Sequence, residues 1–254
     1  MLRPRIRFRP LSRRHLPVGT GASLLFPGSF SASSTHNLSS WSKPGRVSSL
    51  ETKPSLYLMP LGGSVTYGVG SSHGNGYRQF LREMLLADGY RVLFVGSRRS
   101  GSMSNGENEG WRGYRLDQID QRARGSVPTL LPNVFTINAG SNDCIQDFQI
   151  EGFGQRMDNM LEYLWQTTPT SAVILSTLLV NADKQVNSRV TRVNDQLREL
   201  ARVKASKQRN IVLADMNCGQ GPQLEDLVDG THPNDEGYKK MASIWFDAIR
   251  QTAP

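Results

Sequence analysis

From residue 55 onward, short apolar runs alternate with longer stretches in which apolar residues recur at helical spacing. Each apolar run is four to seven residues long, and most contain β-branched residues. This pattern is typical of strands that are buried on both faces. The runs predict five strands, at residues 56–61, 92–96, 134–138, 172–178 and 211–214.

The amphipathic stretches that follow these runs predict helices. In one of them, Met157, Leu161 and Leu164 recur on a single face, as expected for residues that pack into a core. An alternation of strands and helices favours a parallel sheet covered by helices, which is an α/β fold. The predicted helices are 77–87, 116–123, 153–165, 190–205 and 236–250.

The net charge of +8 belongs to the N-terminal segment alone. Residues 1–54 contain nine Lys and Arg residues and one acidic residue, Glu51, whereas residues 55–254 contain 21 basic and 21 acidic side chains. A neutral domain has no electrostatic reason to bind the phosphate backbone of nucleic acid. We therefore expect a folded domain at 55–254 and no nucleic-acid partner.

Residues 1–54 are rich in Arg, Ser and Pro and are predicted to be a disordered basic tail, because they cannot bury enough apolar surface to offset their ordering entropy. The first 50 residues contain many Arg and Ser residues and no acidic residue, which is typical of a mitochondrial transit peptide, although an uninformative extension fits equally well. The best candidate for the apolar core of a secretory signal peptide, residues 22–26, is short and is followed directly by Pro27. No stretch approaches the roughly 18 apolar residues of a membrane span.

Polar motifs follow three of the predicted strands. Ser64 follows the first strand, Asn142 the third and His232 the fifth. Ligands of open parallel sheets bind outside the carboxyl ends of the strands, and these ends lie at one edge of the sheet. We therefore expect the three motifs to meet there and to form an active site.

The residue types at this edge suit nucleophilic catalysis. Gly62 and Gly63 allow the chain to turn sharply off the strand and expose the Ser64 hydroxyl, which needs a base to become a nucleophile. His232 is the candidate base, and Asp229, three residues earlier, is the candidate carboxylate that orients it. Two plainer alternatives are a serine that caps an ordinary turn and a surface turn that leads into the last helix.

Three groups are candidate oxyanion donors: the backbone N–H of Ser64, the backbone N–H of Gly113 and the side-chain amide of Asn142. Read alone, Gly113 or Asn142 could equally be a turn former. Asp143, beside Asn142, fits a structural acceptor for backbone amides better than an acid or base.

The whole set resembles the SGNH, or GDSL-type, hydrolase superfamily over residues 56–250. Ser64, Gly113, Asn142 and His232 match its four namesake positions, and Asp229 matches its carboxylate. The resemblance implies a three-layer α/β/α sandwich with a flavodoxin-like, five-stranded parallel sheet. It also implies a metal-independent serine esterase without a cofactor.

Several further motifs resemble carbohydrate esterases that deacetylate xylan, among them Gly74-Asn75-Gly76-Tyr77-Arg78 and Asn108-Glu109-Gly110. This resemblance implies acetyl esters of small molecules or polysaccharides as substrates. It also implies an extracellular location, whereas the Arg-rich tail favours a mitochondrial one. We expect a monomer. A lysophospholipase-type esterase is the alternative substrate class. A catalytically weakened carbohydrate-binding protein is a further alternative, because Gly63 stands where the family has Asp.

The two cysteines, Cys144 and Cys218, are too few for a disulfide scaffold, and the chain shows no zinc-ligand spacing. Each lies just after a predicted strand. The two are therefore either independent thiols or the partners of a disulfide bond between two loops at the same edge of the sheet. The flavodoxin-like order places the fourth strand between them, which opposes a bond because Cα atoms beyond about 7 Å cannot be joined without movement.

Overall fold

The structure is a computed structural model that describes residues 53–252. The predicted tail, 1–54, lies almost entirely outside the described residues, and so do the targeting interpretations based on it. Within the described residues, no helix combines the length and the apolar character that crossing a membrane requires.

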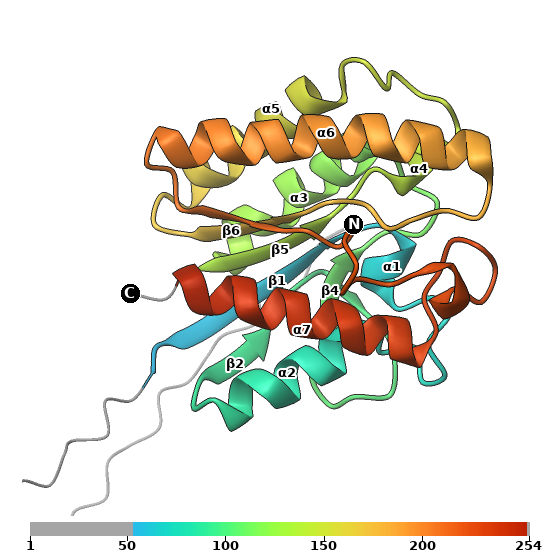
Figure 1. Cartoon of the computed structure of the whole chain (residues 1–254). Coiled ribbons are helices and arrows are strands. Elements are labelled where there is room, and N and C mark those ends of the chain that lie inside the picture. Colours follow the sequence, from blue (N-terminus) through green and yellow to red (C-terminus); the bar gives the residue numbers. More distant parts are fainter. Residues whose placement is uncertain (1–52, 253–254) are drawn as a thin grey trace, which may run out of the picture. The chain divides into compact units, whose positions relative to one another are not determined.

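Five parallel strands form the centre of the sheet, in the order β2-β1-β5-β6-β7 (Figure 1). They correspond to the five predicted strands, and their order along the chain, 2-1-3-4-5, is the flavodoxin-like one. The predicted fold class is therefore confirmed. The bounds are β1 (Ser55–Gly62), β2 (Arg91–Phe94), β5 (Val134–Asn138), β6 (Ala172–Ser176) and β7 (Ile211–Ala214).

Two short strands that the sequence pattern did not predict extend the sheet to seven strands. β4 (Glu107–Gly110) pairs in parallel with the last residues of β1, and β3 (Arg98–Arg99) pairs antiparallel with β4. β4 has no apolar pattern, yet Asn108 and Glu109 are fully buried. Their side chains are hydrogen-bonded, which makes burial of polar groups tolerable.

Helices cover both faces of the sheet (Figure 1). One face carries α2 (Tyr77–Ala87) and α7 (Asp235–Thr252), and the other carries α3 (Leu116–Leu130), α5 (Phe153–Thr167) and α6 (Lys184–Ser206). Two short helices, α1 (Ser64–Tyr67) and α4 (Ser141–Ile145), directly follow β1 and β5. A 3-10 turn, η1 (Leu224–Asp226), precedes α7.

Helix α3 runs seven residues past its predicted end at residue 123. Gly125 and Pro128 both disfavour a helix interior, but Val127 is fully buried in the core and holds the last turn. The chain leaves the helix through Leu131, which has a left-handed φ of 45°. Tertiary packing has here overridden local propensity.

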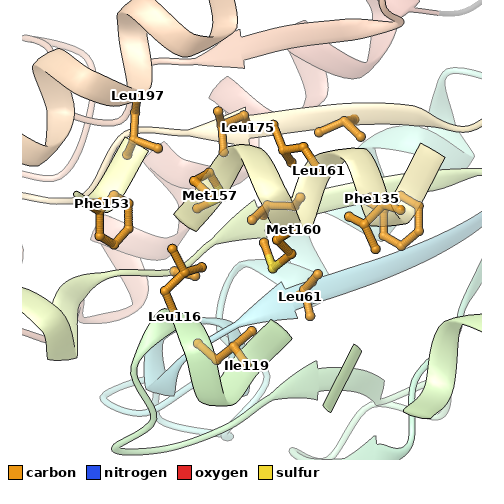
Figure 2. Packing of buried hydrophobic residues seen from close by; sticks show 14 of the residues in the cluster. Leu61, Leu116, Ile119, Phe135, Phe153, Met157, Met160, Leu161, Leu175 and Leu197 are labelled. Atoms are coloured by element: carbon orange, nitrogen blue, oxygen red, sulfur yellow. The ribbon is translucent and has the colours of Figure 1, made fainter. Parts of the chain in front are cut away.

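The core has two layers, one on each side of the sheet, because successive strand residues point to opposite faces. Met59 and Leu61 of β1 pack toward α3, α5 and α6, whereas Leu58 packs toward α2 and α7. Figure 2 shows the first layer, in which Leu61 lies in one cluster with Met160 and Leu161 of α5. The carboxyl edge of the sheet is thus held between two apolar layers.

We predict that Leu161→Ala lowers the free energy of unfolding by about 2–5 kcal/mol, because the fully buried side chain leaves a cavity on truncation. Leu86→Ala on α2 is the matched control, since Leu86 is 41% exposed, and it changes the free energy by less than about 0.5 kcal/mol. Urea denaturation measures both. Equal losses in the two variants would contradict the packing described here.

Candidate active site

Ser64 is placed by the sharp turn at the end of β1. A Cβ on Gly62 would lie 2.0 Å from the carbonyl oxygen of Asn138 on β5, so only glycine permits this approach of the two strands. The Gly62 carbonyl accepts a hydrogen bond from the Trp111 N–H at 2.8 Å. Ser64 then begins α1, with its side chain partly buried at the carboxyl edge of the sheet.

The structure brings Ser64, His232 and Asp229 into one hydrogen-bonded chain. Ser64 Oγ lies 2.7 Å from His232 Nε2, and His232 Nδ1 lies 2.7 Å from Asp229 Oδ2. The other carboxylate oxygen of Asp229 accepts from the backbone N–H groups of Thr231 and His232, at 3.0 and 2.8 Å. Residues 229–232 therefore form a tight loop in which Asp229 contacts His232 and His232 contacts the serine.

The environment keeps Asp229 ionised at neutral pH. Burial alone would raise the pKa of this carboxyl. The hydrogen bonds from the His232 ring and from the backbone N–H groups of His232 and Thr231 outweigh burial, and they lower the pKa below its usual value. An ionised Asp229 can accept a hydrogen bond from a protonated His232 Nδ1, which leaves the unprotonated Nε2 to face the serine.

Asn142 lies next to the serine turn. A Cβ on Gly63 would be 3.6 Å from Asn142 Nδ2, and the same nitrogen donates to the Tyr114 carbonyl at 3.0 Å. Gly63, Ser64, Tyr114 and Asn142 also line one small cavity of about 10 Å³. Such a cavity is about large enough for one water-sized group.

Gly113 lies in the adjoining loop, between β4 and α3. It has a left-handed φ of 78°, a conformation that favours glycine, and a Cβ there would meet open space. It is not among the residues that line the small cavity beside Ser64. The structure thus brings four of the five candidate residues together and places Gly113 one residue from the Tyr114 carbonyl that Asn142 contacts.

Asp143 anchors the Asn142 loop. Its fully buried carboxylate accepts from the Leu116 N–H at 2.9 Å and from Arg156 Nη1 at 2.8 Å. Burial raises the pKa of Asp143, although these two donors act in the opposite direction. The carboxylate therefore joins the starts of α3 and α4 to α5, in agreement with the structural role expected for it.

Sequence reasoning singled out Arg78 only within a family motif, whereas the structure makes it a central support. Arg78 is fully buried on α2. Its position three and seven residues before the buried Leu81 and Leu85 is the signal that could have found it. Burial lowers the pKa of the guanidinium. Its terminal nitrogens donate to the carbonyl oxygens of Tyr67, Gly74, Ser100 and Gly106.

The two cysteines are free thiols. Cys144 is buried on α4, where burial raises the pKa of its thiol to about 12, and Cys218 lies in the loop after β7. β6 separates the two strands that precede them. The structure therefore contradicts the disulfide alternative. Among residues 53–252, no three His, Cys, Asp or Glu side chains are grouped as metal ligands.

A three-layer α/β/α domain with hydrogen-bonded Ser, His and Asp side chains at the carboxyl edge of its sheet has the architecture of a serine hydrolase. Residues 61–240 match the model of the GDSL-like lipase/acylhydrolase family. The chain therefore belongs to this family, and the predicted class, carboxylic ester hydrolase, is confirmed at the level of the family.

A multidomain esterase of Ruminococcus flavefaciens is 27% identical to this chain over an alignment of 267 positions, gaps included, which covers 93% of the chain and 34% of the relative. The chain thus spans about a third of the length of that relative.

Two solved structures are similar to this one in fold. A family 3 carbohydrate esterase of Clostridium thermocellum superposes with a TM-score of 0.70 at 24% identity, over 79% of this chain and 100% of that one. A family 3 carbohydrate esterase of Talaromyces cellulolyticus superposes with a TM-score of 0.67 at 21% identity, over 76% and 96%. At these identities the likeness shows the fold.

We predict that Gly63→Asp folds normally and raises kcat a few-fold. The φ of Gly63 is −94°, outside the left-handed region that favours glycine, and a Cβ there would make only ordinary contacts. The added carboxylate can accept from neighbouring loop amides and so stabilise the serine turn. Steady-state kinetics and a thermal melt check this prediction. A fall in both kcat and Tm would mean that the turn has adapted to glycine.

Proposed function

We propose that this chain is a serine esterase that removes short acyl groups, acetyl above all, from a carbohydrate. The observation that carries the proposal is the hydrogen-bonded chain from Ser64 through His232 to Asp229, with 2.7 Å at each step. Nucleophile, base and orienting carboxylate then stand in the relation that acyl transfer requires.

In the first half of the reaction, Ser64 Oγ attacks the ester carbonyl while His232 Nε2 takes the hydroxyl proton. Asp229 keeps the second ring proton on Nδ1 and stabilises the imidazolium that forms. His232 then gives the proton to the departing alcohol oxygen. In the second half, water attacks the acyl-serine, with His232 again as base, and the acid is released.

The negative charge of the tetrahedral intermediate needs donors that are already in place. Asn142 Nδ2 carries two protons, and one of them is bound to the Tyr114 carbonyl, which fixes the amide and leaves the second proton for the oxyanion. The backbone N–H groups of Ser64 and Gly113 complete the proposed set. Loss of one such donor typically costs about 10²–10³ in rate.

The small space beside the serine supports a short acyl group. The cavity lined by Ser64 and Asn142 measures about 10 Å³, whereas a groove of about 440 Å³ between α5 and α6 contains none of the candidate site residues. The similar structures are named carbohydrate esterases, which supports a sugar as the alcohol part.

We predict that Ser64→Ala and His232→Ala each abolish hydrolysis of p-nitrophenyl acetate without changing the Tm, because the members of a triad act as a unit. Asp229→Asn loses less, since the carboxylate only orients the base. Initial rates and thermal melts measure these effects. More than a tenth of the wild-type rate in the Ser64 variant would refute the mechanism.

We also predict that kcat/KM falls steeply along p-nitrophenyl esters of increasing acyl length, because the large apolar groove between α5 and α6 is lined by none of the candidate site residues. Octanoate should be cleaved at least about a hundredfold more slowly than acetate, which corresponds to about 2.7 kcal/mol in the transition state. An octanoate rate equal to or above the acetate rate would favour the lipid-type alternative.

A further inference from the structure

An array of arginine side chains and aromatic rings lies beside the candidate site. The rings of Trp111 and Tyr114 are stacked, with centroids 5.4 Å apart. The guanidinium carbons of Arg98 and Arg122 each lie 4.5 Å from the centroid of the Trp111 ring, and that of Arg112 lies 5.9 Å from the Tyr67 ring. We call Arg98, Arg112 and Arg122 the arginine cluster.

The aromatic rings under this cluster are attached directly to the catalytic elements. Tyr67 is the last residue of α1, which begins at Ser64. The Trp111 N–H donates to the carbonyl of Gly62 at 2.8 Å, and the Tyr114 carbonyl accepts from Asn142 Nδ2 at 3.0 Å. The guanidinium groups therefore lie against rings that are connected to the nucleophile and to the proposed oxyanion donor.

The arginine cluster carries more positive charge than its surroundings neutralise. Within residues 53–252, none of its three members forms an ion pair, whereas the nearby Arg115 and Arg124 pair with Asp117 and Asp120.

The acid that contacts the array is the buried Glu109, whose carboxylate accepts from Trp111 Nε1 at 2.9 Å and from the Ser97 N–H at 2.6 Å. Three cations against one carboxylate leave an excess of two positive charges.

Cation–π contact and a hydrogen bond hold these guanidinium groups in place. A guanidinium over an aromatic face gains about 0.5–1 kcal/mol at exposed sites, and Arg122 also donates to the Tyr114 hydroxyl at 3.1 Å. Within the described residues, the side chains of Arg98 and Arg112 form no hydrogen bond and lie over the aromatic rings named above. Their planar donor forks are thus positioned by the rings and suit the two oxygens of a carboxylate.

We propose that the arginine cluster binds a carboxylate on the alcohol part of the ester, so that the preferred substrate is an acetylated sugar acid. This inference rests on the proposed esterase function and narrows its substrate class. The charge belongs on the alcohol part because the acyl group of the proposed reaction is a neutral acetyl group. Because Tyr67 ends the helix that Ser64 begins and Trp111 is bonded to Gly62, a sugar acid held at Ser64 is the ligand that the arginines over these rings would meet.

The test compares two esters that differ in one group, a monoacetylated methyl glucuronoside and the corresponding methyl glucoside, with release of acetate as the readout. We expect the wild-type protein to favour the glucuronoside by at least about tenfold in kcat/KM, mainly through KM. Since Arg98 is partly exposed and Arg112 and Arg122 are exposed, 0.5 M NaCl should reduce this preference.

Arg98→Gln and Arg112→Gln should each reduce the ratio of the two kcat/KM values by roughly three- to tenfold, without a change in Tm. Arg250→Gln is the matched control. Arg250 also lies over an aromatic ring, that of Phe246. It is near the C-terminal end of α7, on the order of 25 Å from the N-terminal end of the helix, which follows His232. Its loss removes the same charge and should leave the ratio unchanged.

A wild-type protein that hydrolyses the glucoside as fast as the glucuronoside would overturn the assignment of the cluster and leave the esterase function standing. The assignment is equally overturned if Arg250→Gln lowers the ratio as much as Arg112→Gln. Absence of acetate release from both sugars and from p-nitrophenyl acetate would overturn the esterase function, and this inference with it.

Discussion

The close approach of β1 and β5 at Gly62 is the constraint on which the candidate site depends. A side chain at this position would collide with the Asn138 carbonyl oxygen, 2.0 Å from the place of a Cβ. The next residue, Gly63, donates its N–H to the same oxygen at 3.3 Å, and Trp111 binds the Gly62 carbonyl. Ser64 leaves the sheet from this clamped point, so its hydroxyl reaches His232 at 2.7 Å.

Polar bonds hold the loops around this point, in contrast to the apolar packing that holds the sheet. Arg78 ties four loop carbonyls together, and Asp143 joins three helices through Leu116 and Arg156. A buried charge costs a great deal of free energy unless it is paired or hydrogen-bonded, so loop positions that break these bonds are disfavoured. These bonds therefore fix the positions of loops that have little regular structure.

The sequence predicts the strands and helices well where an apolar pattern exists, as at β5 and β7, whose bounds it gives to the residue. It misses β4, because the buried side chains of Asn108 and Glu109 are stabilised by partners elsewhere in the chain. It also shortens α3, since the burial of Val127 depends on the tertiary fold.

The same distinction applies to the site. Asp229 and His232 are predictable because they belong to one short loop, and Ser64 because it ends a strand. The Arg156 partner of Asp143 is not, since nothing in the local sequence pairs residues 13 positions apart on different elements. The arginine cluster is hidden for the same reason, because its members come from β3, the loop after β4 and α3.

The net charge of a domain, finally, determines its attraction for distant ions and does not determine the local charge at its active site. Residues 55–254 contain equal numbers of acidic and basic side chains, so they exert little attraction on a distant polyanion. Charges act strongly only within about 8–10 Å at physiological ionic strength. An excess of two positive charges beside Ser64 is therefore compatible with a neutral domain. It can select among esters that have already reached the carboxyl edge of the sheet, where the planar guanidinium groups meet a carboxylate directly.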